Sequence, residues 1–320
     1  MRKMRGVVVA MTTPFTTDGE VDFEALYSEI EFLLKARVHA LYPCGTTGEM
    51  LFMTSEQREA VAKAVVDKVA GRVPVYIHVG AARIEDTIRL ATHAHRIGAD
   101  GVGVVTPLFF QLNDRELENF YLTVSRSLPQ DFPIYMYNIP QCSANDLKPE
   151  VCARVVAKCK NVIGIKYSYC DMHRTLDYLQ LRMLRDDFSV LVGFDRLLLP
   201  ALLIGCDGTV SGAASVFPEP FVEAYEKYMA GDMIGAEVAM WRANDIVKKL
   251  KAGTSLGTFK EAQRLRGFGG GYVRAPLMEI TEQEKESLKQ ELEMYLYMYR
   301  TGDTPFGADA PSSNLHNQSK

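Results

Sequence analysis

Short runs of β-branched and other apolar residues alternate with amphipathic helical stretches along residues 1–231 of this chain. The apolar runs have the length of buried strands, and apolar residues recur at helical spacing in the stretches between them. The predicted strands are 6–11, 40–43, 73–79, 101–106, 132–137, 162–166, 188–192 and 208–211. The predicted helices are 23–36, 55–70, 84–97, 114–127, 149–159, 172–185, 194–204 and 218–230. Eight parallel strands, each followed by a helix, close most naturally into an α/β fold of the TIM-barrel type, (β/α)8.

Local start and stop signals support this division. Thr54-Ser55-Glu56-Gln57 and Asn113-Asp114-Arg115-Glu116 place capping residues directly before two of the helical stretches. Gly98 ends another helix just ahead of the strand that begins at Gly101.

The alternation stops after about residue 232. Three further helices are predicted there, at 233–251, 256–266 and 281–299. The last residues are rich in Gly, Pro, Ser, Asn and Asp and carry no apolar period, which indicates a flexible tail. The predicted organisation is a barrel at 1–231, a C-terminal helical extension at 232–300 and the tail at 301–320.

The composition excludes several classes of protein. With 47% hydrophobic and 24% charged residues, the chain can bury one large core, as an ordinary globular enzyme does. A formal net charge of −4 and a pI near 5.9 provide no basic field for nucleic acid. The six cysteines form no C-x-x-C pair and no zinc spacing, so a reducing cytoplasm is the expected compartment. The apolar run at 6–11 is too short for a secretory signal or a membrane span, and no membrane association is expected.

Lys166 points most directly to chemistry. It ends the apolar run Asn161-Val-Ile-Gly-Ile-Lys166, which is predicted to be a buried strand. Burial favours the neutral form of a lysine amine, and a neutral amine can attack a 2-keto acid to form a Schiff base. The structural alternative is a lysine that only extends its amine to solvent.

Two other segments follow predicted strands and would meet Lys166 at the C-terminal end of the barrel, where TIM-barrel active sites lie. The glycines of Gly45-Thr46-Thr47-Gly48 allow a turn that presents backbone N–H groups and a hydroxyl to a carboxylate. Tyr137 is able to donate and accept a proton beside a buried amine. The plain alternatives are a strand-to-helix turn and a buried tyrosine with a bonded hydroxyl.

Four segments in this order resemble the signature segments of the dihydrodipicolinate synthase / N-acetylneuraminate lyase family: Gly45-Thr-Thr-Gly-Glu49, Tyr137-Asn-Ile-Pro140, Gly164-Ile-Lys166 and Gly193-Phe-Asp195. The similarity extends from Met11 to Leu277. This resemblance implies a TIM barrel with a C-terminal helical extension that assembles as a homotetramer. It also implies that pyruvate or a 2-keto acid binds as an imine on the lysine, with no metal or organic cofactor.

The resemblance assigns roles by motif position. Lys166 is the Schiff-base lysine, and Tyr137 is the general acid and base. Thr46 and Thr47 hold the pyruvate carboxylate, with Thr46 counted in the catalytic group. The further residues that would contact substrate are Gly45, Val210 through its backbone carbonyl, Gly193, Asp195, Arg196, Cys142 and Ser168.

Three departures from the family pattern bear on the reaction. Phe109 stands where the synthases carry one of the tyrosines that relay protons into a neighbouring subunit's site. Cys142 replaces an arginine that grips the carboxylate of the aldehyde partner, a charge-assisted contact that is strong when bidentate. Tyr167-Ser168 replaces the Glu-Ala that typically follows the lysine. These changes favour the aldolase branch, which handles sialic acid or 2-keto-3-deoxy sugar acids.

The far end of the substrate would meet the segments after the seventh and eighth strands. Asp195 matches a carboxylate that binds sugar hydroxyls in the sialic acid lyases, whereas Arg196 and Gly212 replace a glutamate and a serine. A shorter or acidic substrate, such as a 2-keto-3-deoxy aldonic or aldaric acid, is therefore favoured over sialic acid. In the alternative, Arg196 points outwards and only solvates the rim.

The leading prediction is a class I aldolase that cleaves a 2-keto acid to pyruvate and an aldehyde. One alternative is a dihydrodipicolinate synthase or a keto-acid dehydratase that uses the same imine. Another is a barrel that binds a keto acid without turnover. The set of Lys166, Tyr137, Thr46 and Thr47 argues against the last, because a binding protein has no need of a nucleophilic amine.

Overall fold

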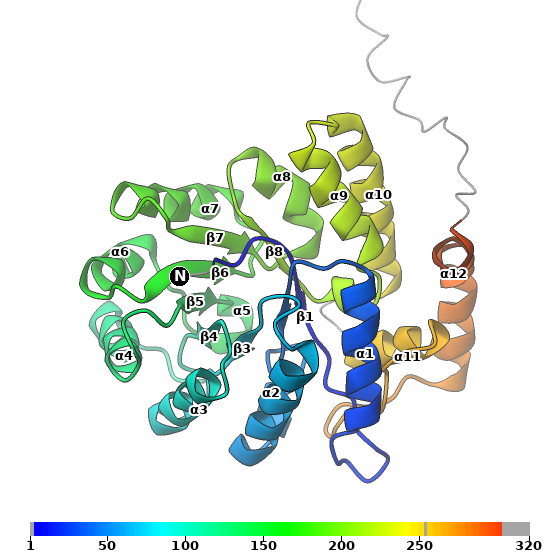
Figure 1. Ribbon diagram of the computed structural model, residues 1–320, viewed down its shortest axis with the longest axis horizontal. Coiled ribbons are helices and arrows are strands. Elements are labelled where there is room, and N and C mark those ends of the chain that lie inside the picture. The colour runs from blue at the N-terminus through cyan, green and yellow to red at the C-terminus, as the bar shows by residue number, and fades with distance from the viewer. Residues whose placement is uncertain (1–2, 253–254, 303–320) are drawn as a thin grey trace, which may run out of the picture.

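A closed barrel of parallel strands forms the centre of the molecule (Figure 1). The computed structural model describes residues 3–252 and 255–302. Within these ranges, eight strands follow the order β2-β1-β8-β7-β6-β5-β4-β3. A parallel bridge between Leu41 and Val75 brings the two ends of this sheet together and closes the barrel. The strands are β1 (Gly6–Ala10), β2 (Ala40–Tyr42), β3 (Tyr76–His78), β4 (Gly101–Val105), β5 (Ile134–Asn138), β6 (Val162–Tyr167), β7 (Ser189–Val192) and β8 (Gly208–Ser211).

Helices follow the strands and ring the barrel (Figure 1), which confirms the predicted TIM barrel. The ring consists of α1 (Phe23–Lys35), α2 (Ser55–Val69), α3 (Ile84–Arg96), α4 (Asp114–Arg126), α6 (Pro149–Lys158), α7 (Met172–Leu179), α8 (Leu198–Leu203) and α9 (Glu219–Met229). Short helical turns lie between these elements: η1 (Met50–Phe52), α5 (Pro140–Ser143), η2 (Gln180–Met183), η3 (Asp195–Leu197) and η4 (Ala213–Ser215).

The capping signals act where they were predicted. Thr54 and Gln57 form a reciprocal capping box at α2, and Asn113 and Glu116 form another at α4. Two predicted helices are shorter than expected. The helix predicted at 172–185 ends at residue 179 and tightens into the 3₁₀ turn η2, and the one predicted at 194–204 begins as the 3₁₀ turn η3. The strand predicted at 73–79 is also reduced, to 76–78.

Large tyrosines fill the barrel interior, and glycines face them. Tyr42, Tyr76 and Tyr135 are fully buried in one cluster with aliphatic residues of the other strands. A Cβ atom on Gly103 would lie 1.8 Å from the Tyr42 hydroxyl, and one on Gly164 would lie 2.4 Å from the Tyr135 ring. Only glycine therefore leaves room for these rings at the centre of the barrel.

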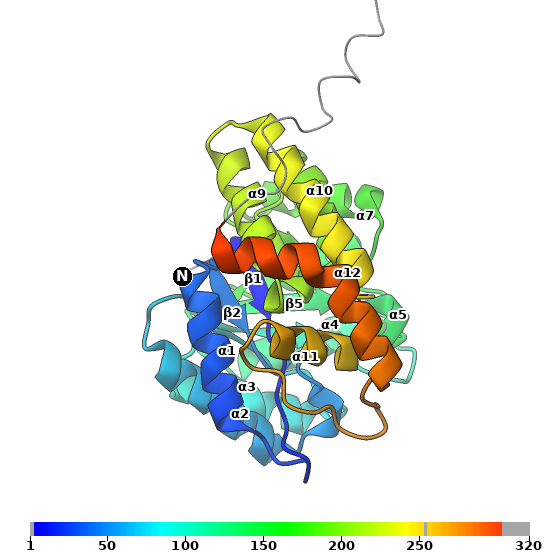
Figure 2. The same cartoon turned by 90° about the vertical axis from the view of Figure 1, so that its right-hand side faces the viewer.

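The predicted C-terminal helices are present as α10 (Met233–Lys249), α11 (Leu256–Leu265) and α12 (Glu282–Thr301). Figure 2 shows all three on one side of the barrel. A hydrogen bond of 2.7 Å from the Tyr295 hydroxyl to Asp245 joins α12 to α10. Most of the tail predicted at 301–320 lies outside the described residues.

A buried polar network ties α11 to the N-terminal part of the barrel. The Thr12 hydroxyl lies 2.6 Å from Glu29 Oε2 and 3.2 Å from Gln263 Oε1. Burial raises the pKa of the Glu29 carboxyl to about 7, although hydrogen bonds from Thr12 oppose the rise. A neutral Glu29 fits this geometry, because it can donate to Thr12 while the single hydroxyl proton of Thr12 is donated to Gln263.

Candidate active site

Lys166 and Tyr137 lie side by side on neighbouring strands. They are direct partners in the parallel register of β5 and β6. Lys166 is only 5% exposed, and its Nζ lies 4.2 Å from the centre of the Tyr137 ring. The structure thus brings the predicted amine and the predicted proton donor together inside the barrel.

Two further side chains complete an aromatic wall around the amine. The Tyr42 ring, from β2, has its centre 5.0 Å from Lys166 Nζ. The imidazole of His78, from β3, is perpendicular to the Tyr137 ring, and the centres of these two rings are 5.8 Å apart. The His78 and Tyr42 ring centres are 6.0 Å apart. Neither residue was predicted from the sequence. His78 nevertheless carries the signal that singled out Lys166, a polar ionisable residue at the end of a buried apolar run.

His78 is held as a neutral imidazole with a defined tautomer. Its Nδ1 lies 3.1 Å from the Cys44 carbonyl oxygen and 3.5 Å from an Arg58 nitrogen, so the shorter contact assigns the ring proton to Nδ1. Arg58 also donates to the backbone carbonyl of His78, at 2.8 Å. Burial, together with the nearby Arg58 guanidinium, holds the pKa of His78 well below its ordinary value.

The loop after β2 presents the predicted threonines. Thr46 is exposed and Thr47 is half-buried. The Gly45 carbonyl accepts hydrogen bonds from the Gly48 and Met50 N–H groups, at 3.1 and 3.2 Å, so the loop forms a tight turn. A Cβ atom on Gly212 would lie 3.2 Å from Thr47 Oγ1, which places Thr47 against the segment that follows β8.

A buried ion pair anchors the end of this loop. Lys260, from α11, and Glu49 are in contact at 2.6 Å, and both side chains are 0% exposed. The Lys260 amine also donates to the Thr13 and Tyr272 carbonyls, at 2.7 and 2.5 Å. The other Glu49 carboxylate oxygen accepts from the Arg274 N–H at 2.9 Å. Burial lowers the pKa of Lys260, and the Glu49 charge partly offsets this effect.

Glycine is required at position 193, directly after β7, because this position lies next to Lys166. A Cβ atom on Gly193 would lie 2.9 Å from Lys166 Cε and 1.8 Å from the hydroxyl oxygen of Ser168. Ser168 is buried, and its backbone carbonyl accepts a hydrogen bond of 2.7 Å from Gln141. Val210 lies buried in β8, separated from β6 only by β7. Gly193 thus lies against both Lys166 and Ser168, and Val210 lies two strands away from Lys166.

Residues 3–295 match the sequence profile of the Dihydrodipicolinate synthetase family. The chain belongs to this family. It is similar to 4-hydroxy-tetrahydrodipicolinate synthase of Methanoculleus marisnigri, with 34% identity over 90% of this chain and 98% of the relative. It is also similar to the probable 2-dehydro-3-deoxy-D-pentonate aldolase YjhH of Escherichia coli, with 33% identity over 74% of this chain and 78% of the relative.

A solved family structure has the same fold. This is YagE, a prophage protein of Escherichia coli K12, in complex with pyruvate, and it superposes with a TM-score of 0.87. The two sequences are 29% identical over 92% of this chain and 99% of YagE. Together with the family profile, these relatives identify the chain as a class I, pyruvate-dependent lyase.

Among the residues predicted to contact the far part of the substrate, Asp195 has a buried carboxylate oxygen, whereas Arg196 and Cys142 are exposed. Burial raises the pKa of the Asp195 carboxyl, and interactions with Ser211 and the backbone of Ala213 oppose the rise. Asp195 is thus held against the segment after β8, with one buried oxygen that has no hydrogen-bond partner among the described residues.

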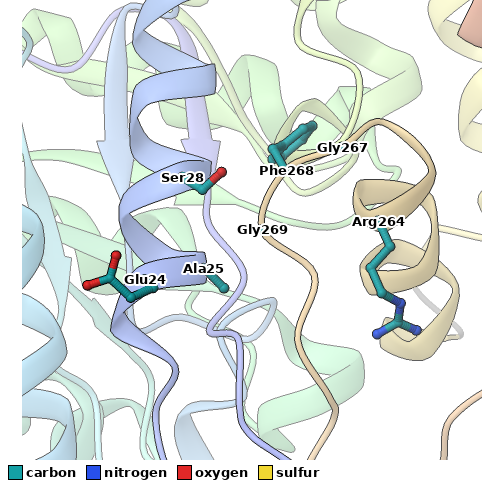
Figure 3. Close-up of a pocket in the computed structure, with 7 residues that line it drawn as sticks. All are labelled: Glu24, Ala25, Ser28, Arg264, Gly267, Phe268 and Gly269. Atoms are coloured by element: carbon teal, nitrogen blue, oxygen red, sulfur yellow. The ribbon is translucent and has the colours of Figure 1, made fainter.

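A separate hollow of about 400 Å³ lies away from Lys166, between α1 and the turn that follows α11 (Figure 3). Glu24 and Ser28 line one wall, and Phe268 and Arg264 line the other. Arg264 is already paired with Glu261 and Glu279. The glycine-rich segment 267–271 follows α11, and its residues 267 and 269 form the rest of the wall that contains Phe268.

Within residues 3–252 and 255–302, no group of three or more His, Cys, Asp or Glu side chains is arranged to hold a metal ion. In the same ranges, every helix is too short or too polar to cross a membrane.

Proposed function

We propose that this family member is an aldolase that cleaves a 2-keto-3-deoxy sugar acid to pyruvate and an aldehyde, with Lys166 as the imine-forming amine. The position of Lys166 carries the proposal, because its buried Nζ lies 4.2 Å from the ring of Tyr137 on the neighbouring strand. Lys260 is the other buried lysine among the described residues. Its amine is engaged by the Glu49 carboxylate and by two backbone carbonyls, so it is not available as a nucleophile.

The chemistry follows from these two groups. The Lys166 amine adds to the C2 carbonyl to give a carbinolamine. Tyr137 protonates the carbinolamine hydroxyl, which leaves as water, and the nitrogen lone pair forms the C=N bond of an iminium ion. The Tyr137 phenolate then takes the proton of the C4 hydroxyl. The C3–C4 bond breaks, its electron pair forms an enamine, and the aldehyde departs. Protonation at C3 and hydrolysis release pyruvate and restore the amine.

The aldolase outcome is favoured over dihydrodipicolinate synthesis by two positions. Phe109 is 83% exposed and has no hydroxyl, so it supplies no proton to a relay. Cys142 is exposed and uncharged in its usual thiol form, so it offers no bidentate cation to a carboxylate. The similarity to the probable pentonate aldolase of Escherichia coli supports the same reading. The second candidate is the synthase reaction, which the similarity to the Methanoculleus enzyme favours.

The test uses pyruvate with borohydride, which reduces an imine to a stable amine. One pyruvate-derived adduct per chain is expected, on the peptide that contains Lys166, and Lys166→Ala should abolish both adduct and turnover. A panel of 2-keto-3-deoxy acids and sialic acid, followed by pyruvate release, identifies the substrate class. An adduct on a different lysine contradicts the assignment of Lys166, and condensation of pyruvate with aspartate semialdehyde without aldol cleavage establishes the synthase instead.

We also propose that Arg196 reads a distal carboxylate. Its guanidinium forms no ion pair within the described residues, and it directly follows Asp195 at the mouth of the site. Arg196→Glu should raise KM for a diacid substrate and leave KM for a neutral-tailed analogue unchanged. Equal effects on the two substrates would show that the residue only solvates the rim.

We further propose a homotetramer. Phe109, Phe110 and Leu51 are large apolar side chains that are 83%, 72% and 62% exposed, and Phe109 adopts a left-handed φ of 75°. The Phe109 and Phe110 ring centres are 5.1 Å apart, and adjoining exposed apolar groups of this kind are typical of a contact surface. Light scattering at several protein concentrations should give four chains per particle, and a monomer at every concentration contradicts the proposal.

A further inference from the structure

Two buried polar atoms beside Lys166 have no hydrogen-bond partner among the described residues. They are the hydroxyl oxygen of Tyr42 and Nε2 of His78. Each of these side chains is 1% exposed. Buried polar atoms in folded proteins are nearly always hydrogen-bonded to protein groups or to ordered water. We therefore expect each of these two atoms to bind a water molecule or a ligand.

Both side chains reach the same part of the barrel interior, at the paired residues Gly103 and His78 of β4 and β3. The Tyr42 side chain crosses the interior from β2 and ends against Gly103 of β4, where a Cβ atom would lie 1.8 Å from the hydroxyl. Gly103 is the register partner of His78 in β3. The Tyr42 ring centre is 5.0 Å from Lys166 Nζ, and its ring lies 6.0 Å from that of His78.

The two atoms are chemically complementary. The contact of Nδ1 with the Cys44 carbonyl at 3.1 Å makes Nε2 the acceptor nitrogen of His78. The Tyr42 hydroxyl has a proton to donate, although its oxygen can also accept. A carboxylate cannot satisfy Nε2, and an ammonium group cannot accept from Tyr42. A water molecule, or a substrate hydroxyl, satisfies both because it donates one hydrogen bond and accepts another.

We propose that Tyr42 and His78 form a binding site for one water molecule beside Lys166, and that this water is the one exchanged when the imine forms and hydrolyses. The inference rests on the proposed function, which supplies the imine. On imine formation the carbinolamine C–O bond breaks, the Tyr137 proton joins the departing oxygen, and the electron pair of nitrogen forms the C=N bond. The water stays between Tyr42 and His78, and it attacks the imine carbon on hydrolysis.

The experiment measures imine kinetics in three variants. Tyr42→Phe removes only the hydroxyl, His78→Leu removes the acceptor, and His78→Gln keeps an acceptor oxygen. Rapid mixing with pyruvate and timed borohydride quenching give the rate constants for imine formation and hydrolysis. Tyr42→Phe and His78→Leu should each lower both rate constants by about 5- to 10-fold, the effect of one hydrogen bond. The equilibrium fraction of imine should stay unchanged, and His78→Gln should recover part of the rate.

Tyr135→Phe is the matched control, because its hydroxyl lies in the same barrel but accepts from Met4 N at 2.7 Å. It should leave both rate constants as in the wild type. Wild-type rates in both Tyr42→Phe and His78→Leu overturn the inference, as does a changed imine fraction, which would indicate that Lys166 had been displaced.

A crystal structure of the unliganded wild type tests the site without any variant. A water within hydrogen-bonding distance of Tyr42 Oη and His78 Nε2 is expected, and the lack of density there overturns the inference even if the variants do not fold. If the wild type forms no adduct on Lys166, the proposed function fails, while the crystallographic result still decides the water site.

Discussion

Replacing Lys260 tests how strongly the C-terminal extension holds the loop that ends at Glu49. The pair is fully buried, so Lys260→Met leaves the Glu49 carboxylate with a single hydrogen bond, from the Arg274 N–H. The Thr13 and Tyr272 carbonyls lose their donor as well. Breaking a buried ion pair in this way costs about 3–5 kcal/mol. Methionine has a similar volume and keeps the contact with the Phe15 ring, so the cavity contribution is small.

The assay is urea unfolding at one fixed protein concentration, followed by circular dichroism. Lys260→Met should lower the free energy of unfolding by about 3–5 kcal/mol. Adding Glu49→Gln should return part of this loss, because it removes the uncompensated carboxylate. Lys63→Met is the matched control, since Lys63 and Asp67 are 60% and 59% exposed and such a pair contributes about 0–1 kcal/mol. A loss below about 1 kcal/mol for Lys260→Met, or a double variant no more stable than that single one, would refute the reasoning.

Three further predictions concern the site and its support. Tyr137→Phe should leave the borohydride adduct on Lys166 detectable and lower kcat for cleavage by about 10²-fold, the usual contribution of a general acid and base; an unchanged kcat contradicts this role. Gly193→Ala should lower kcat and the melting temperature, because its Cβ would overlap the Ser168 hydroxyl at 1.8 Å, and wild-type values in both measurements contradict the close packing. Because the pKa of Glu29 is raised from 4.5 to about 7, its neutral form stabilises the fold fully below pH 4.5, and this contribution should be lost as the pH rises to about 7. Unfolding free energies measured across this range should show that slope in the wild type and lose it in Glu29→Gln.

The barrel could be predicted because its signal is local. Each buried strand is a short apolar run, and each helix has its own period and cap, as at Thr54 and Asn113. The helix boundaries were less well predicted, because the choice between an α turn and a 3₁₀ turn at 180–183 and 195–197 depends on tertiary contacts rather than on periodicity.

The centre of the site could be predicted in part. Lys166 and Tyr137 stand at strand ends, so parallel register alone brings them together. Tyr42 was missed because a tyrosine in a short apolar run has the appearance of an ordinary core residue. Its approach to the lysine depends on barrel closure and on the space that Gly103 leaves. The pairing of Glu49 with Lys260 joins residues far apart in the chain, and two charged residues at such a distance give no sequence pattern that links them.

The buried contact of α11 with the loop after β2 has a consequence for the order in which the protein is made. Synthesis begins at the N-terminus, so β1 to β8 emerge before Lys260. Arg274, whose N–H binds Glu49, emerges 225 residues after Glu49. Until then a ribosome-bound barrel carries an uncompensated carboxylate next to the threonines that would hold pyruvate. A product truncated within α10 therefore has all the barrel strands, but the loop after β2 lacks its contacts with α11. We expect such a product to be degraded by proteases rather than to persist as an enzyme of low activity.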